Sequence, residues 1–225
     1  MNSTTKHLSL RDKLCTVLVQ GKGIVIRNKF LTEDELKRLR NVGKGGDETA
    51  RQVGRKIPVR DWLVIDLALS TGLRVNEIRE LKCGDIMMTD DYSLITVRNG
   101  KGGKMRTVYF NGQLKIHLKE YLEWKSVSNE GVNPEDPLLL SARTGGLFSK
   151  RALQRVFERM AKMAGITGHC FHHLRHTYAS HLYKAGGYNL RLVQKQLGHA
   201  NIRTTQIYAD VFDEDLKKAL EKLYI

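Results

Sequence analysis

The sequence predicts a mainly α-helical fold with one small antiparallel β-sheet, an α+β architecture. Apolar residues recur at helical spacing in several segments, among them 75–81, 114–122 and 149–160. Two short runs rich in β-forming residues, 94–97 and 105–110, flank a glycine-rich stretch, which is typical of a β-hairpin. A chain of 225 residues is also long enough to bury a substantial core.

The N-terminal part of the chain gives weaker signals. Residues 1–27 have a short apolar face that a Gly-Lys-Gly stretch at 21–23 interrupts, so we expect a frayed helix or an arm there. Thr32 followed by Glu35 has the spacing of a capping box, which predicts the start of a helix. The segment 43–55 is rich in glycine and charge and is predicted to be a loop.

Proline, glycine and capping residues mark the later helix boundaries. A buried helix is expected from about Pro58, and Gly72 is suited to ending it. Arg74 then lies at the N-terminal edge of a second, short helix, and residues 99–103 form the tip of the hairpin. Further helices are expected from residue 114, after Ser149, over 172–185, from the cap Asn189 to Gly198, and in short pieces over 203–208 and 213–223.

The charge of the chain indicates a polyanionic partner. There are 38 Lys and Arg against 24 Asp and Glu, which gives a formal net charge of +14 and a pI near 9.8. Nucleic acid is the leading candidate, because basic surfaces neutralise phosphates and release counterions without further specificity.

Cysteine usage and hydropathy indicate the cellular compartment in which we expect the protein. The three cysteines, Cys15, Cys83 and Cys170, are odd in number and widely scattered, which does not make a disulfide framework. No apolar run reaches the roughly 18 to 20 residues that span a bilayer, and the N-terminus lacks the pattern of a secretory signal. We therefore expect a cytoplasmic protein, associated with the nucleoid if its partner is DNA.

A series of cationic residues that ends in a tyrosine indicates phosphate chemistry. Two arginines, two histidines and a lysine can neutralise a phosphate in transition, and a tyrosine can attack it. His172 and Arg175 stand three residues apart, which places them on one face of a helix. The residues are Arg74 in Thr-Gly-Leu-Arg, Lys101 in Gly-Lys-Gly-Gly-Lys, His172 and Arg175 in His-His-Leu-Arg-His, His199 in Leu-Gly-His, and Tyr208 in Thr-Thr-Gln-Ile-Tyr.

With these motifs in this order, the sequence resembles the catalytic domain of the tyrosine recombinase, or phage-integrase, family, and its Xer-like members in particular. The resemblance runs from about Ile26 to the C-terminus and implies that 28–225 have the tyrosine recombinase catalytic-domain fold. It implies a site-specific recombinase that cleaves and rejoins double-stranded DNA through a covalent 3′-phosphotyrosyl intermediate. The intermediate conserves the energy of the broken ester, so no metal, ATP or other cofactor is expected.

The resemblance also implies a role for each residue of the series. Tyr208 is the nucleophile, and Arg74 and Arg175 bind the non-bridging phosphate oxygens. His172 contacts the scissile phosphate and helps the tyrosine lose its proton, while His199 donates a further hydrogen bond.

Two further assignments concern the hairpin tip and the short helix. Lys101 is expected to protonate the leaving 5′ oxygen, with Lys104 as the rival assignment. Glu77 matches a supporting acidic position of the family, although an ordinary surface ion pair is nearly as good an interpretation.

Other interpretations remain open at this stage. A type IB topoisomerase shares the tyrosine and arginine logic, and a DNA-binding regulator can keep the fold without strand exchange. The histidines and the cysteine at 169–176 also invite a zinc site, but no glutamate follows His172 as the metalloprotease pattern requires.

The length and the C-terminal sequence bear on assembly. Family members usually carry a core-binding domain before the catalytic one, and here some 27 residues precede the recognisable part, as in a short recombinase, a decayed one or a catalytic fragment. An apolar stripe lies within 211–223. In the family such a helix docks on a neighbouring protomer, so we expect a monomer or weak oligomer in solution and a tetramer on DNA.

Overall fold

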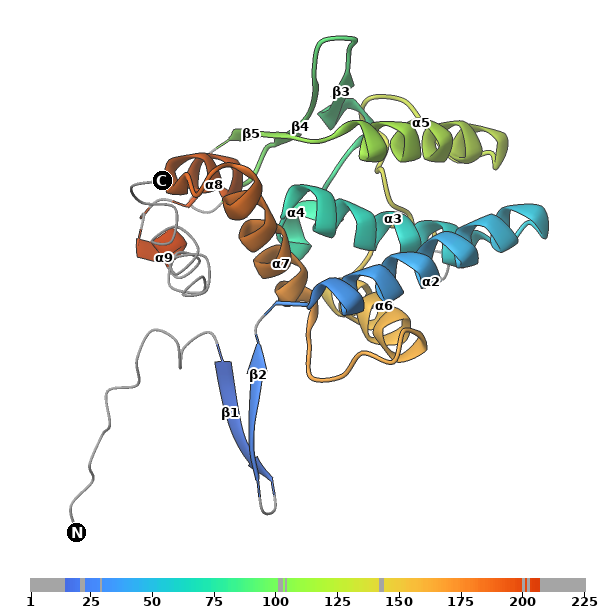
Figure 1. The fold of residues 1–225 in the computed structure, drawn as a ribbon. Helices are drawn as coiled ribbons and strands as arrows, with labels where there is room; N and C mark the ends of the chain where they lie inside the picture. The colour runs from blue at the N-terminus through green and yellow to red at the C-terminus, as the bar shows by residue number, and fades with distance from the viewer. Residues whose placement is uncertain are drawn as a thin grey trace, which may run out of the picture.

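The mainly helical fold with a small antiparallel sheet is confirmed by the computed structural model (Figure 1). It describes residues 15–20, 23–28, 30–100, 103, 105–141, 144–199, 201 and 203–206, with backbone alone for 15–28, 203 and 204. The helices are α2 (Glu33–Gln52), α3 (Lys56–Thr71), α4 (Val75–Arg79), η1 (Cys83–Asp85), α5 (Gly112–Val127), α6 (Lys150–Met163), α7 (Phe171–Ala185), α8 (Leu190–Leu197) and α9 (Arg203–Gln206). The strands are β1 (Cys15–Gln20), β2 (Gly23–Asn28), β3 (Ile86–Met88), β4 (Ser93–Val97) and β5 (Arg106–Tyr109).

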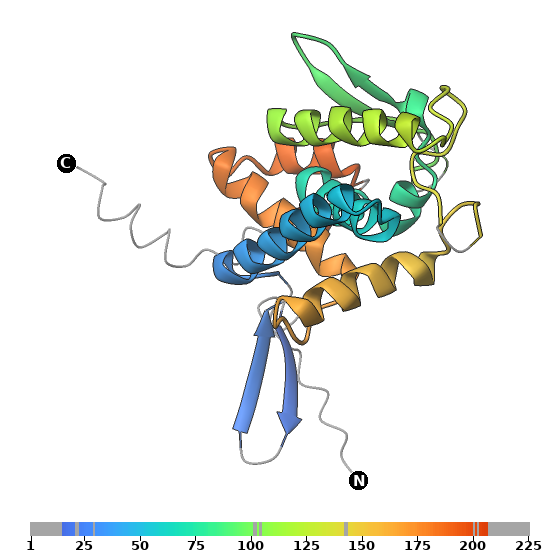
Figure 2. The same ribbon diagram turned by 90° about the vertical axis from the view of Figure 1, so that its right-hand side faces the viewer.

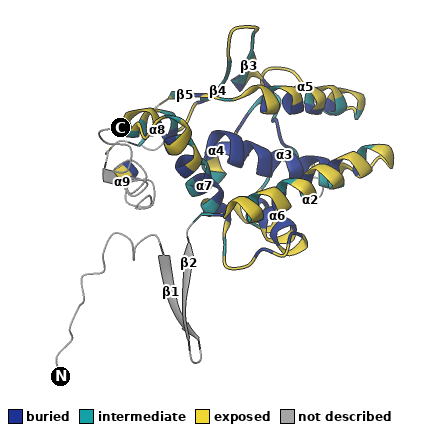
Figure 3. Ribbon diagram, in the orientation of Figure 1, coloured by how far each residue is buried: buried dark blue, intermediate teal, exposed yellow. Residues whose placement is uncertain are grey.

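Helix α3 forms the centre of the domain. It contacts α2, α5, α6 and α7, which surround it in both ribbon views (Figures 1 and 2). Almost all of its length is buried, and Leu63, Ile65 and Leu67 have no exposed surface (Figure 3). As predicted, Gly72 ends the helix, with a left-handed φ of 65° that a glycine adopts without strain.

Helix α2 corrects the prediction of a loop over 43–55. The helix runs to Gln52 because one face, with Leu39, Gly43 and Ala50, is buried against the rest of the domain. Gly43 lies directly under a tryptophan of α3, where a larger residue has no room. A glycine within a helix costs about 1 kcal/mol relative to alanine. Tertiary packing thus outweighs this cost in α2.

The capping residues identified in the sequence begin the helices they were assigned to. The Thr32 hydroxyl accepts from the backbone N–H of Glu35, whose side chain binds the backbone N–H of Thr32, a complete capping box. The side-chain oxygens of Ser149 and Asn189 each accept from the backbone N–H three residues further on, which caps α6 and α8 without a reciprocal bond. Of the short C-terminal helices, α9 lies within 203–208, and 213–223 lies outside the described residues.

Two antiparallel sheets are present in the described part of the chain. The predicted hairpin is confirmed as β4 and β5, with Val97 opposite Arg106 as the last pair before the turn, and β3 adds a third strand that the sequence did not predict. β1 and β2 form a separate hairpin that extends from the helical part (Figures 1 and 2). The frayed helix considered for 1–27 is therefore wrong over 15–20 and 23–27, where the backbone is a β-hairpin. None of the described helices is long and apolar enough to cross a membrane.

Candidate active site

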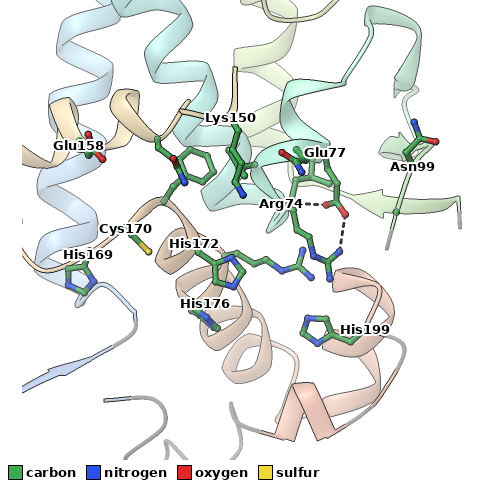
Figure 4. Close-up of a pocket in the computed structure, with 17 residues that line it drawn as sticks. Arg74, Glu77, Asn99, Lys150, Glu158, His169, Cys170, His172, His176 and His199 are labelled. Atoms are coloured by element: carbon green, nitrogen blue, oxygen red, sulfur yellow. Dashed lines mark hydrogen bonds and ion pairs between the residues drawn. The ribbon is translucent and has the colours of Figure 1, made fainter. Parts of the chain in front are cut away.

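A cavity of about 910 Å³ lies where α4, α6, α7 and the end of α8 meet (Figure 4). Five residues that the sequence analysis selected, far apart in the chain, line this one cavity: Arg74, Glu77, His172, Arg175 and His199. Lys101, its rival Lys104 and Tyr208 lie outside the described residues. Asn99 and Gly100, which directly precede Lys101, do line the cavity.

Arg74 enters the cavity from the N-cap of α4, two residues after the glycine that ends α3. Its Nη1 donates to Oε1 of Glu77 at 2.9 Å, and its backbone N–H donates to Oε2 of the same carboxylate at 2.8 Å. The arginine side chain remains 28% exposed, so its guanidinium is both oriented and open to the cavity.

Glu77 is a buried carboxylate and not the surface ion pair considered from the sequence. It accepts two hydrogen bonds from Arg106, at 2.9 and 2.8 Å, in addition to those from Arg74. Burial by itself raises the pKa of Glu77, but the bonds from Arg106 and Arg74 outweigh burial and hold the pKa at about 2. Glu77 is therefore ionised at neutral pH.

Arg106 is the member of this cluster that sequence reasoning missed. It begins β5, and its side chain is largely buried. The signal was present in the alternation of the strand, because Arg106 shares a face with Val108, which is buried completely. An arginine on an inward face requires a carboxylate partner, and Glu77 is the one it finds.

Arg175 reaches the cavity from α7 and is only 3% exposed. Its Nη1 donates to the carbonyl oxygen of Gly72 at 2.5 Å, and its Nη2 donates to the carbonyl oxygen of Leu197 at 2.8 Å. Both carbonyls belong to helix C-terminal ends, those of α3 and α8, where a cation is favourable. Arg175 therefore holds three helices together at the cavity wall.

The two histidines favour the neutral form in this cationic surrounding. His199 follows Gly198, whose left-handed φ of 65° ends α8, and its Nδ1 lies 3.0 Å from Oγ1 of Thr205. Burial, then Arg175, Arg74, Arg106 and His172, lower the pKa of His199 to about 4. Burial, followed by Arg175, His173 and Arg74, also lowers the pKa of His172. An anion in the cavity would reverse part of both shifts.

Three further histidines form ring contacts at the cavity: His169, which precedes α7, and His173 and His176 of α7. His169 and His176 also line the cavity. The ring of His176 lies 4.7 Å from that of His172, centroid to centroid, and His169 lies against His173 with their Nδ1 atoms 3.1 Å apart. His169 Nε2 is also 3.6 Å from Glu35. Within the part of the chain that the structure describes, no three His, Cys, Asp or Glu side chains are grouped as ligands of a metal ion.

A mostly helical domain that gathers arginines and histidines at one cavity has the architecture of the tyrosine recombinase catalytic domain, and known structures agree. A crystal structure of XerA recombinase is similar with a TM-score of 0.69 and 31% identity, over 87% of this chain and 65% of that one. The XerH site-specific recombinase bound to palindromic difH substrate, a post-cleavage complex, gives a TM-score of 0.69 and 28% identity, over 86% of this chain and 52% of that one.

The sequence places the chain in a family. Residues 29–215 match the phage integrase family, and the chain belongs to it. The tyrosine recombinase XerC of Caldanaerobacter subterraneus subsp. tengcongensis is 34% identical over 195 residues, which are 86% of this chain and 50% of that protein. The chain thus spans about half the length of this curated relative.

Proposed function

We propose that the chain carries the catalytic centre of a site-specific DNA recombinase, which cleaves and rejoins double-stranded DNA through a 3′-phosphotyrosyl intermediate. One observation supports this most directly: Arg74, His172, Arg175 and His199, from three separate segments, line a single cavity of about 910 Å³. Each of these side chains can donate to a phosphate oxygen, and fixed donors around a five-coordinate phosphorus lower the barrier to its formation. We also propose the division of the chain into an arm, 1–27, and a catalytic domain, 28–225.

The proposed reaction combines an attack on phosphorus with two proton transfers. The phenolic oxygen of Tyr208 attacks the phosphorus while the bond from phosphorus to the 5′ oxygen breaks, and Arg74 and Arg175 bind the non-bridging oxygens. His172, whose pKa is lowered, accepts the tyrosine proton, and Lys101 protonates the leaving oxygen. A 5′ hydroxyl then attacks the phosphotyrosine in the reverse step, so the number of phosphoester bonds does not change.

The proposed partners are double-stranded DNA and further copies of the chain. The net charge of +14 favours DNA, and the similar XerH is described as bound to a difH substrate. We propose a monomer or weak oligomer in solution, a tetramer on DNA, and association with the nucleoid. The named relatives are recombinases, which favours strand exchange over strand relaxation or regulation without cleavage.

Covalent trapping tests the proposed function. Nicked suicide duplexes with randomised central sequences lose the 5′-hydroxyl strand after cleavage, so that an adduct accumulates and its DNA can be sequenced. We expect the chain to form a 3′-phosphotyrosyl adduct and Tyr208→Phe to form none while still binding DNA, because only the phenolic oxygen is lost. Tyr92→Phe, at an exposed tyrosine between β3 and β4, is the matched control and retains the adduct.

The outcomes separate the alternatives. DNA binding without any adduct from the unaltered chain would favour a regulator and overturn the proposal. An adduct from Tyr208→Phe would leave the reaction standing but move the nucleophile to another tyrosine.

A further inference from the structure

Arg106 connects three parts of the cavity wall, although it does not itself line the cavity. Its guanidinium binds both carboxylate oxygens of Glu77, the planar bidentate geometry that arginine alone provides. The same carboxylate binds the side chain and the backbone of Arg74. Glu77 therefore joins a buried arginine of β5 to the cavity arginine of α4.

The position of Arg106 along β5 adds a second connection. Arg106 pairs with Val97 in the last register position before the turn that carries Lys101. Residues Asn99 and Gly100 of that turn line the cavity. The bond from Arg106 to Glu77 thus fastens the base of the lysine turn to α4.

The third connection runs to the end of α8. A Cβ atom at Gly198 would lie 2.5 Å from Cδ and 2.8 Å from Nε of Arg106, so the backbone before His199 passes directly over the arginine side chain. Gln196 strengthens this contact, because its side chain donates to the carbonyl oxygen of Tyr109 and accepts from the backbone N–H of the same β5 residue. β5 and the α8 end therefore form one packed unit.

We propose that Arg106 is a positioning residue: by holding Glu77, it orients Arg74 toward the phosphate and fixes the spacing between the lysine turn and the loop that carries His199. This inference rests on the proposed function of the same site. Arg106 would act on the reaction through Glu77, Arg74 and His199, without contact with the reacting atoms.

Removal of Arg106 should make the site sensitive to acid. The charged groups that act on Glu77 are Arg106 from β5 and Arg74 from α4, and burial opposes both. Without Arg106 the balance moves toward burial, so the pKa of Glu77 rises and the carboxylate becomes protonated as the pH falls. On the other side of Glu77, the neighbouring charged groups Glu80, Lys82, Asp85 and Arg98 are engaged in the ion pairs Arg79–Glu80, Lys82–Glu135, Arg98–Asp85 and Arg98–Glu135. On the cavity side, Glu77 shares the wall with Arg175, His172 and His199.

A pH profile of single-turnover cleavage tests the proposal. We expect Arg106→Ala to lose about tenfold in rate for each pH unit below the raised pKa of Glu77, in addition to the pH dependence of the unaltered chain. Arg106→Ala combined with Glu77→Gln removes the added acid dependence, because glutamine does not titrate. Arg51→Ala is the matched control: it takes an arginine from the buried carboxylate of Asp47 on α2 and keeps the unaltered profile.

The conservative variant keeps the test valid if Arg106→Ala does not fold. Arg106→Lys retains a charge beside Glu77 but cannot bind both oxygens in the bidentate geometry. We expect the unaltered pH profile and a rate lower by about tenfold, the factor that corresponds to one lost hydrogen bond to a charged group. An unaltered rate in Arg106→Lys, or an unaltered profile in Arg106→Ala, would overturn the proposal.

The pKa of His199, followed by NMR, gives a readout that does not depend on cleavage. His199 is surrounded by Arg175 of α7, Arg74 of α4, Arg106 of β5 and His172 of α7, which with burial lower its pKa to about 4. We expect the pKa to rise in Arg106→Ala and to stay unchanged in Arg51→Ala. If the unaltered chain forms no phosphotyrosyl adduct, the proposed function alone is rejected. If it forms the adduct, but Arg106→Ala leaves both the pH profile and the pKa of His199 unchanged, the role of Arg106 alone is rejected.

Discussion

At the scale of single residues, the two arginines of the cavity are held in different ways. Arg74 is partly exposed at a helix start and is oriented by Glu77. Arg175 is buried, and it also satisfies the carbonyl oxygens of Gly72 and Leu197 at two helix ends. Both arginines are proposed to bind the phosphate, but only Arg175 also connects helix ends.

This difference predicts separate effects on rate and on stability. Arg74→Ala and Arg175→Ala each lose a phosphate donor, so we expect cleavage to fall by about 100 to 1000-fold in both. Arg175→Ala also leaves two buried carbonyls without a donor, which lowers the free energy of unfolding by about 2–6 kcal/mol. Single-turnover cleavage and denaturant unfolding measure the two effects. Equal stability of the two variants would contradict the structural role of Arg175.

At the scale of elements, α2 shows how packing selects a glycine within a helix. Gly43 and Gly45 both lie in α2, two residues apart. A Cβ atom at Gly43 would lie 2.1 Å from Cε3 of Trp62, whereas a Cβ atom at Gly45 would meet nothing within 4 Å. One glycine permits the close approach of α2 to α3, and the other only weakens the helix.

The two glycines predict opposite responses to the same substitution. Gly45→Ala stabilises the domain by about 0.5–1 kcal/mol, because alanine loses less backbone entropy than glycine on helix formation. Gly43→Ala destabilises it by about 1–3 kcal/mol, because the added methyl group displaces the Trp62 ring. Equilibrium unfolding in urea compares them, and a gain of stability in Gly43→Ala would show that the ring can move without loss.

At the scale of the whole molecule, charge and the cavity act together on the proposed DNA partner. A net charge of +14 attracts any phosphate backbone. In the proposed function, the cavity adds fixed donors for one phosphate, including Arg74 and Arg175. Binding therefore combines a general electrostatic attraction with a few oriented contacts.

This combination predicts a strong dependence of DNA binding on salt. The logarithm of the affinity falls with the logarithm of the salt concentration, with a slope of about −0.9 for each phosphate neutralised. We expect Arg74→Ala to reduce the steepness by about one phosphate, and Arg51→Ala, at a residue that does not line the cavity, to leave it unchanged. Fluorescence anisotropy over a series of salt concentrations measures the slopes, and a flat dependence would contradict a phosphate-dominated interface.

Features encoded within a few neighbouring residues were predictable from the sequence. The capping box at Thr32 and Glu35, the glycine ends of α3 and α8, and the spacing of His172 and Arg175 on α7 all appear as predicted. Each depends on hydrogen bonds or helix periodicity over at most four residues, which the local sequence specifies by itself.

Features that depend on distant partners required the tertiary structure. The sequence selected Glu77 but not Arg106, which lies 29 residues away, and it selected Arg175 without indicating that its guanidinium binds Gly72, 103 residues away. The glycines of α2 predicted a loop in the sequence, because the space under Trp62 exists only after α3 has packed. Local sequence determines which side chains can bind a phosphate, whereas the burial of α3 decides which of them meet and how each is held.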